Sequence, residues 1–158
     1  MAHDSQPALT HLDEAGKARM VDVGAKPPMR RRAVAECLIR ARRETLDAVT
    51  SGHLPKGEAL AVARVAGIQA AKRTDTLIPL CHTLPLDAVS IEFDRRDPQS
   101  LGVVATASIT ARTGVEMEAL TGAAVAALTI YDMTKAIDRE IVIDGLRLLE
   151  KTKMPMEG

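Results

Sequence analysis

GVEMEALTGAAVAALTIYDMTK, residues 114–135, is the stretch that decides the fold. It is rich in alanine and nearly free of aromatic residues, and it predicts the longest helix of the chain, from Gly114 to about Asp138. Thr113 stands at the N-cap position and Glu116 follows three residues later, so we expect a capping box at the start of this helix.

Two shorter helices are predicted before this one. Residues 58–73 are rich in alanine and carry apolar residues at helical spacing. Residues 43–50 predict a short helix that Ser51 and Gly52 stop, and residues 53–57 then read as a loop. Small side chains allow such helices to approach one another closely, but each buries little area, which hints that a partner subunit completes the core.

Strand patterns surround these helices. Residues 88–95 alternate between apolar and polar, and a turn at 97–100 leads into a second strand from 101 to about 110, so the pair predicts an antiparallel hairpin. Residues 19–24 are short and strand-like, while residues 32–40 fit either a strand or a helix.

The remaining two segments are a loop and a final strand. Two prolines exclude a regular helix at 74–86, yet this stretch is apolar, so we expect a loop packed against the rest of the protein. Residues 141–150 predict a last strand with a break at Asp144 and Gly145.

The order of these elements is strands, helices, hairpin, helix, strand. It predicts an α+β fold in which helices cover one face of a mostly antiparallel sheet. A length of 158 residues suits a single domain, 1–158, with flexible tails at residues 1–10 and 152–158.

Composition excludes several classes of protein. Lys and Arg balance Asp and Glu at 21 each, whereas proteins that bind nucleic acid or membrane surfaces usually carry a basic excess. Phe93 and Tyr131 are the two aromatic residues, too few for a base-stacking platform. Cys37 and Cys81 form no C-x-x-C pair, and we see no signal peptide and no apolar run of about 20 residues, so we expect a cytoplasmic protein with reduced thiols.

Asp132 and Lys135 lie three residues apart and therefore share one face of the long helix. Such a pair can be tuned for proton transfer, although ordinary surface ion pairs have the same spacing. Glu118 lies 14 residues before Asp132, on about the same face and roughly 21 Å away along the axis. One small substrate cannot touch both within one chain, so a shared site requires a long ligand or an antiparallel second chain.

Other polar residues offer chemistry of their own. His82 can bind an anion or protonate a leaving group, and Cys81 beside it is more simply a buried cysteine. Lys56 in its glycine loop suits a phosphate, but no Walker sequence is present. A metal-dependent hydrolase using His82 and the carboxylates is an alternative, although no H-x-x-x-H or C-x-x-C spacing supports it.

Longer motifs narrow these alternatives. They are MVDV at 20–23, KG at 56–57, AGIQAAKRT at 66–74, LIPLCH at 77–82, TGVEMEALT at 113–121 and AALTIYDM at 126–133. Together they resemble the cyclic pyranopterin monophosphate synthase family, the molybdenum cofactor biosynthesis C proteins, over nearly the whole chain from about Leu9 to Lys151.

The resemblance implies a ferredoxin-like α+β fold and an enzyme of molybdenum cofactor biosynthesis. The family converts 3′,8-cyclo-7,8-dihydro-GTP into cyclic pyranopterin monophosphate and pyrophosphate, using a substrate supplied by a radical SAM GTP cyclase. It implies a homohexamer built as a trimer of dimers, with active sites at the dimer interface. No cofactor is expected, and Mg²⁺ on the triphosphate stays an open alternative.

The resemblance also assigns site residues by position. Asp132, Lys135 and Lys56 match the catalytic aspartate and the two lysines. The matched substrate-binding positions are Leu80, Cys81, His82, Glu116, Met117, Glu118, Arg31 and Lys151, the last two for phosphates. Three features depart from the family pattern: Thr83 replaces a proline, a tryptophan is missing near Asp75, and no glycine-rich basic tail follows Lys151. A non-catalytic protein that kept the scaffold is a further alternative, against which the retention of both lysines and Asp132 argues.

Overall fold

One antiparallel sheet forms the body of the protein in the computed structural model, which describes residues 11–156. The tail predicted at 1–10 and the last two residues lie outside the described residues. The four strands are β1 (Met29–Arg40), β2 (Ala88–Asp97), β3 (Ser100–Ala111) and β4 (Val142–Met154). Their order across the sheet is β2-β3-β1-β4 with every pairing antiparallel, which is the ferredoxin-like arrangement.

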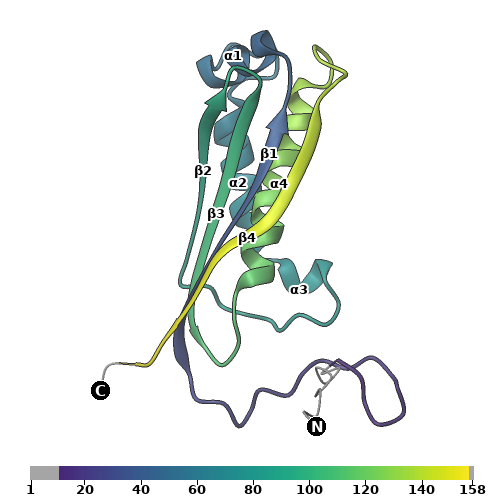
Figure 1. The fold of residues 1–158 in the computed structure, drawn as a ribbon, viewed down its shortest axis with the longest axis vertical. Coiled ribbons are helices and arrows are strands. Elements are labelled where there is room, and N and C mark those ends of the chain that lie inside the picture. Colours follow the sequence, from purple (N-terminus) through teal and green to yellow (C-terminus); the bar gives the residue numbers. More distant parts are fainter. Residues whose placement is uncertain (1–10, 157–158) are drawn as a thin grey trace, which may run out of the picture.

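Helices cover one face of this sheet (Figure 1). They are α1 (Arg43–Ser51), α2 (Ala59–Ala71), the single turn α3 (Thr74–Leu77) and α4 (Glu116–Thr134). The α+β prediction with helices on one face is therefore confirmed. Among residues 11–156, no helix is long and apolar enough to cross a membrane.

Small residues bring α4 close to its neighbours. Ala119, Ala123, Ala126 and Ala127 are fully buried against the sheet and α2. At the crossing of α2 and α4, a Cβ added to Gly67 would lie 2.8 Å from the carbonyl oxygen of Gly122. The alanine and glycine content of the two helices thus sets how closely they pack.

Most of the predicted elements are confirmed, and the ambiguity at 32–40 is resolved as strand β1. The predicted break at Asp144 and Gly145 is a bulge in a continuous strand β4 and not an interruption, because the β1–β4 register shifts between Glu36 and Leu38 and Gly145 has a φ of +64°. Residues 88–97 alternate in burial as expected, with Ile91 innermost.

Four expectations were wrong. Residues 19–23 have no regular secondary structure, Gly24 begins a turn, and the segment pairs with no strand among the described residues. Thr113 does not cap α4, whose N-cap is Val115 with no side-chain cap hydrogen bond. Residues 152–154 belong to β4 and pair with β1, so they are not a tail. A turn of helix, α3, fits at Thr74–Leu77 because Pro79 lies beyond its last residue.

Candidate functional site

Lys56 and Lys135 both contact the carboxylate of Asp132 at the C-terminal end of α4. Lys135 Nζ donates to Asp132 Oδ1 at 2.6 Å, and Lys56 Nζ lies 3.6 Å from Oδ2 and donates to the Asp132 carbonyl oxygen at 3.1 Å. All three side chains are about half exposed. The structure therefore brings together the three residues assigned to catalysis, from two segments 76 residues apart.

Local structure explains how these groups meet. Lys135 is the C-cap residue of α4, so its side chain leaves the helix where Asp132 lies one turn earlier. Lys56 lies in the loop between α1 and α2, which Gly52 (φ +73°) and Gly57 (φ +90°) turn sharply. These positive φ values favour glycine and aim the intervening residues at the end of α4.

The charges of this cluster stabilise one another. The hydrogen bond and charge of Lys135, followed by the charge of Lys56, lower the pKa of Asp132 below its ordinary value. The same hydrogen bond raises the pKa of Lys135. Asp132 is therefore a carboxylate and Lys135 an ammonium near neutral pH, which is the protonated form that a proton donor requires.

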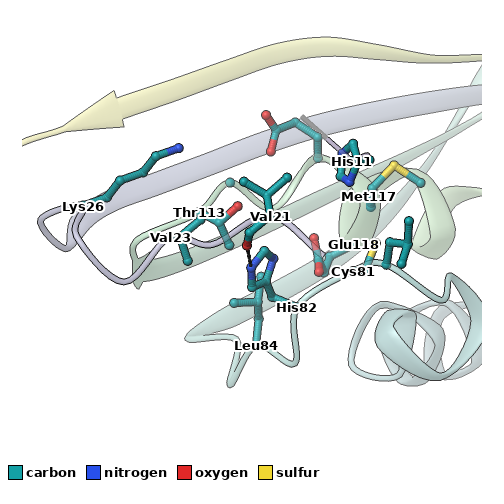
Figure 2. Close-up of a pocket in the computed structure, with 13 residues that line it drawn as sticks. His11, Val21, Val23, Lys26, Cys81, His82, Leu84, Thr113, Met117 and Glu118 are labelled. Atoms are coloured by element: carbon teal, nitrogen blue, oxygen red, sulfur yellow. Dashed lines mark hydrogen bonds between the residues drawn. The ribbon is translucent and has the colours of Figure 1, made fainter. Parts of the chain in front are cut away.

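A pocket of about 340 Å³ lies at the opposite, N-terminal end of α4 (Figure 2). Its walls come from the segment before β1, from the loop after α3 and from the start of α4. The lining residues include Leu80, Cys81, His82, Glu116, Met117 and Glu118. Six of the eight predicted substrate-binding residues thus meet in one place.

His82 and Glu118 are the most distinctive groups of this pocket. His82 Nε2 lies 2.8 Å from the carbonyl oxygen of Val21, which orients the ring. Glu118 is 4% exposed, and its burial raises the pKa of its carboxyl group. Burial likewise raises the pKa of the Cys81 thiol, which disfavours the nucleophilic thiolate. Cys81 therefore fits the role of a pocket-lining residue.

The two predicted phosphate ligands lie beside this pocket. Lys151 Nζ donates to Glu116 Oε1 at 2.7 Å. Burial would raise the pKa of Glu116, but this hydrogen bond and the charges of Lys151 and Arg31 lower it overall. Arg31 donates to the carbonyl oxygens of Ala111 and Arg112, both at 3.2 Å, and lines an adjoining pocket of about 270 Å³ instead.

Sequence reasoning missed residues of the segment that precedes β1. His11, Val21, Val23 and Lys26 also line the first pocket, with Lys26 opposite Met117 in Figure 2. The MVDV motif at 20–23 was the available signal, because it carried the resemblance without any assigned role. A segment without regular secondary structure has no periodicity from which its contacts could be inferred.

The candidate site is therefore divided between the two ends of α4. Lys135 and Asp132 lie at one end and Glu118 at the other, 14 residues apart or roughly 21 Å along a regular helix. Within residues 11–156, no three His, Cys, Asp or Glu side chains are grouped so that they could hold a metal ion. The alternative of a metal-dependent hydrolase thus finds no support.

Comparison with known proteins gives a consistent result. The model of the MoaC family matches residues 20–153. A protein of Novosphingobium aromaticivorans named cyclic pyranopterin monophosphate synthase is 57% identical over 143 residues, 90% of each chain. One of Herpetosiphon aurantiacus with the same name is 56% identical over 145 residues, 91% of this chain and 88% of its own. The chain belongs to the MoaC family.

Proposed function

We propose that this protein is a cyclic pyranopterin monophosphate synthase of molybdenum cofactor biosynthesis. It converts 3′,8-cyclo-7,8-dihydro-GTP into cyclic pyranopterin monophosphate and releases pyrophosphate. The similarity to two proteins of that name over about 90% of the chain supports the activity. The Lys56–Asp132–Lys135 cluster is the observation that carries it to this chain, because it supplies proton donors without a metal.

The cluster supports a proton-shuttled rearrangement. Lys135 and Lys56 supply protons as the guanine-derived ring opens and closes again, and Asp132 holds Lys135 in its charged form. A ribose hydroxyl attacks the α-phosphorus and pyrophosphate leaves, while Arg31 and Lys151 offset the developing negative charge. His82, Glu116, Met117 and Glu118, with Leu80 and Cys81, hold the ring system in the pocket.

A complete site uses two chains in this proposal. The pocket of about 340 Å³ is lined by neither Lys56, Asp132 nor Lys135, so the substrate-binding residues and the lysine cluster of one chain do not share a cavity. Antiparallel pairing of α4 with a second copy places Lys135 of one chain near the pocket of the other. We propose a hexamer of three such dimers, acting in the cytoplasm on the product of a radical SAM GTP cyclase, without a protein-bound cofactor.

Incubation of the purified protein with 3′,8-cyclo-7,8-dihydro-GTP tests the activity directly. We expect a pterin product with its characteristic fluorescence after oxidation, together with one equivalent of pyrophosphate. A parallel reaction with a chelator shows whether Mg²⁺ on the triphosphate contributes. Hydrolysis to a monophosphate without pterin formation would refute the proposed activity.

Replacement of the lysines tests their assignment. Lys135→Ala and Lys56→Ala are expected to lower kcat by about 10²–10⁴-fold, the usual contribution of a positioned proton donor. Both side chains are about half exposed, so the variants should fold normally, as circular dichroism can verify. Full turnover by either variant would remove that lysine from the mechanism.

A further inference from the structure

Asp138 is a buried carboxylate next to the lysine cluster that the proposed reaction does not use. Its residue is 1% exposed and its side chain is fully buried. Asp138 Oδ2 accepts hydrogen bonds from the backbone N–H of Arg42 at 3.0 Å and the Thr45 hydroxyl at 2.9 Å. Asp138 Oδ1 accepts one from the backbone N–H of Glu140 at 3.0 Å.

These contacts make Asp138 a cap for a helix that is distant in sequence. Arg42 is the N-cap residue of α1 and provides no side-chain cap of its own. The carboxylate of Asp138, 96 residues later, accepts the backbone N–H of this N-cap residue, as an N3 side chain does in a capping box. Its negative charge at the start of α1 is also favourable for the helix dipole. The Arg42 guanidinium reinforces the junction by donating to the carbonyl oxygen of Ile137.

The junction joins the two segments that carry the lysines. Lys135 lies three residues before Asp138, in a turn where the backbone N–H groups of Ile137 and Asp138 both donate to the carbonyl oxygen of Thr134. The helix that Asp138 caps, α1, leads at its other end into the 53–57 loop with Lys56. One side chain therefore connects the end of α4 to the start of the segment that presents Lys56.

Asp138 stays ionised despite its burial. Burial by itself would raise the pKa of this carboxyl group, but hydrogen bonds from Arg42, Glu140 and Thr45 lower it overall. A charged acceptor with three donors in fixed places forms a rigid junction. Such rigidity suits a site in which small displacements of a proton donor are costly.

We propose that Asp138 is a positioning residue that sets the placement of Lys56 and Lys135 relative to Asp132. The inference rests on the proposed function. Asp138 touches no substrate and transfers no proton, and it acts by holding the α1 start against the α4 end.

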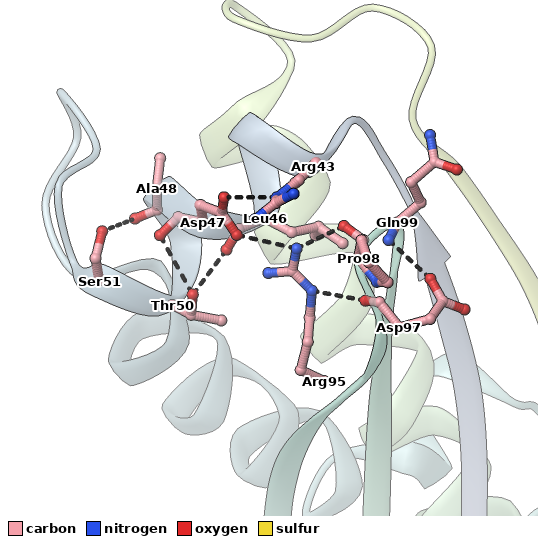
Figure 3. Close-up of polar contacts among 10 residues, drawn as sticks. All are labelled: Arg43, Leu46, Asp47, Ala48, Thr50, Ser51, Arg95, Asp97, Pro98 and Gln99. Atoms are coloured by element: carbon pink, nitrogen blue, oxygen red, sulfur yellow. Dashed lines mark hydrogen bonds and ion pairs between the residues drawn. The ribbon is translucent and has the colours of Figure 1, made fainter.

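Helix α1 has other anchors, so loss of this junction loosens it without unfolding it. Leu46 and Val49 are buried in the core. Arg95 Nη2 donates to Asp47 Oδ1 at 3.1 Å and Arg95 Nε to the carbonyl oxygen of Asp97 at 2.8 Å, which ties α1 to the β2–β3 turn (Figure 3). A change at Asp138 is thus expected to act locally.

Three variants test the proposal by disturbing the contacts of Asp138 to different extents. Asp138→Asn removes the charge, Thr45→Val removes one hydrogen bond with little change of volume, and Thr45→Ser keeps that hydroxyl. Glu36→Gln is the matched control, because Glu36 is an equally buried and ion-paired carboxylate that contacts neither lysine nor pocket. All are assayed as full-length protein below their unfolding temperatures.

We expect Asp138→Asn to lower kcat by about 10- to 100-fold, the scale of loss from a misplaced catalytic group, with KM little changed because the pocket lies at the other end of α4. Thr45→Val should show a smaller loss of kcat that Thr45→Ser restores, and Glu36→Gln should keep its kcat. Amide hydrogen exchange should speed up at 53–57 and 135–138 while β1 and β3 stay protected.

Two results would overturn the proposal. One is wild-type kcat, or wild-type exchange at 53–57 and 135–138, in a folded Asp138→Asn protein. The other is a fractional loss of activity in Asp138→Asn or Thr45→Val that is no larger than the fraction of that variant that is unfolded under the assay conditions. If the wild-type protein does not convert the cyclised GTP, the proposed function fails. Hydrogen exchange at 53–57 and 135–138 then still tests whether Asp138 holds the two lysine-bearing segments in place.

Discussion

At the scale of single residues, Asp132 raises the pKa of Lys135 and lies beside a second lysine. It accepts a 2.6 Å hydrogen bond from Lys135 and lies 3.6 Å from Lys56 Nζ. On spacing alone, Asp132 and Lys135 would be an ordinary i,i+3 ion pair of a helix surface. The addition of Lys56 from another segment distinguishes this cluster from such a pair.

Asp132→Asn should therefore change the pH dependence of turnover. The hydrogen bond and charge of Asp132 raise the pKa of Lys135 above its ordinary value of 10.5, so their removal lowers it. Activity that needs the Lys135 ammonium is present below this pKa and is lost as pH rises through it. The basic limb of the kcat–pH profile should move to lower pH in the variant.

The control for this shift is a carboxylate in a similar pair elsewhere. Asp144 accepts from Arg40 Nε at 2.7 Å and is 42% exposed, so it pairs with an arginine of β1 rather than with Lys56 or Lys135. Asp144→Asn should leave the basic limb unmoved. An unmoved limb in Asp132→Asn as well would show that Lys135 is not the titrating proton donor.

At the scale of elements, the crossing of α2 and α4 depends on two glycines. A Cβ on Gly67 would lie 2.8 Å from the Gly122 carbonyl oxygen and 2.9 Å from Ile91 Cγ1, so backbone would have to move. A Cβ on Gly122 would meet its nearest atoms at 3.3 to 3.5 Å, which small shifts can relieve.

Gly67→Ala should therefore lower the free energy of unfolding, because overpacking a core costs about 1–3 kcal/mol and the gain in helix propensity of about 1 kcal/mol offsets only part of that cost. Gly122→Ala is the matched control, and its gain in helix propensity of about 1 kcal/mol should roughly offset its closer contacts. Urea denaturation monitored by circular dichroism measures both. Equal stabilities of the two variants would contradict the close crossing at Gly67.

At the scale of the whole molecule, one ion cluster spans the sheet. Glu36 on β1 is 4% exposed and accepts from Arg147 of β4 at 2.6 Å and from Arg96 of β2 at 3.0 Å. Strand β3 lies between β2 and β1, and Arg96 crosses it where Gly102 leaves room, since a Cβ there would lie 2.7 Å from Arg96 Nε. The hydrogen bond from Arg147 is the main cause that lowers the pKa of Glu36, and it outweighs burial.

This cluster predicts a pH-dependent stability. Because the pKa of Glu36 is lowered in the folded protein, its contribution is complete above its ordinary pKa of 4.5 and is lost as pH falls through the folded value. Glu36→Gln should cost on the order of 2 kcal/mol at pH 7, as for hydrogen bonds to charged groups. Urea titrations should show the gap to wild type narrowing in acid, and a gap independent of pH would contradict the assignment.

The proposed division of the site between two chains predicts complementation. Lys135→Ala disables one end of α4 and His82→Ala the other, so each variant alone should be nearly inactive. A randomly mixed dimer restores one intact site in each heterodimer, which gives about one quarter of wild-type activity. Subunits are mixed by co-expression with two affinity tags, and turnover of the cyclised GTP is compared with that of each variant. A mixture as inactive as its parents would place the whole site in one chain.

The sequence by itself determined most of the element types and the residues to examine. Alternation at 88–95 and alanine-rich helical spacing at 58–73 are local patterns, and local patterns follow directly from the chain. The long motifs identified Lys56, Asp132 and Lys135 before any geometry was known. The N-cap at Thr113 was wrong because α4 begins at Glu116 with Val115 as its N-cap, and the Glu116 carboxylate accepts a hydrogen bond from Lys151 of a distant strand.

Tertiary structure alone decided which of these residues meet. Lys56 reaches Asp132 across 76 residues, Asp138 caps a helix 96 residues away, and Lys26 joins the pocket from a segment without periodicity. Such contacts depend on how strands and helices are placed by packing, and no spacing along the chain encodes them. The separation of the lysines from the Glu118 pocket follows instead from the length of α4, which was readable from the sequence because the rise of a helix is constant.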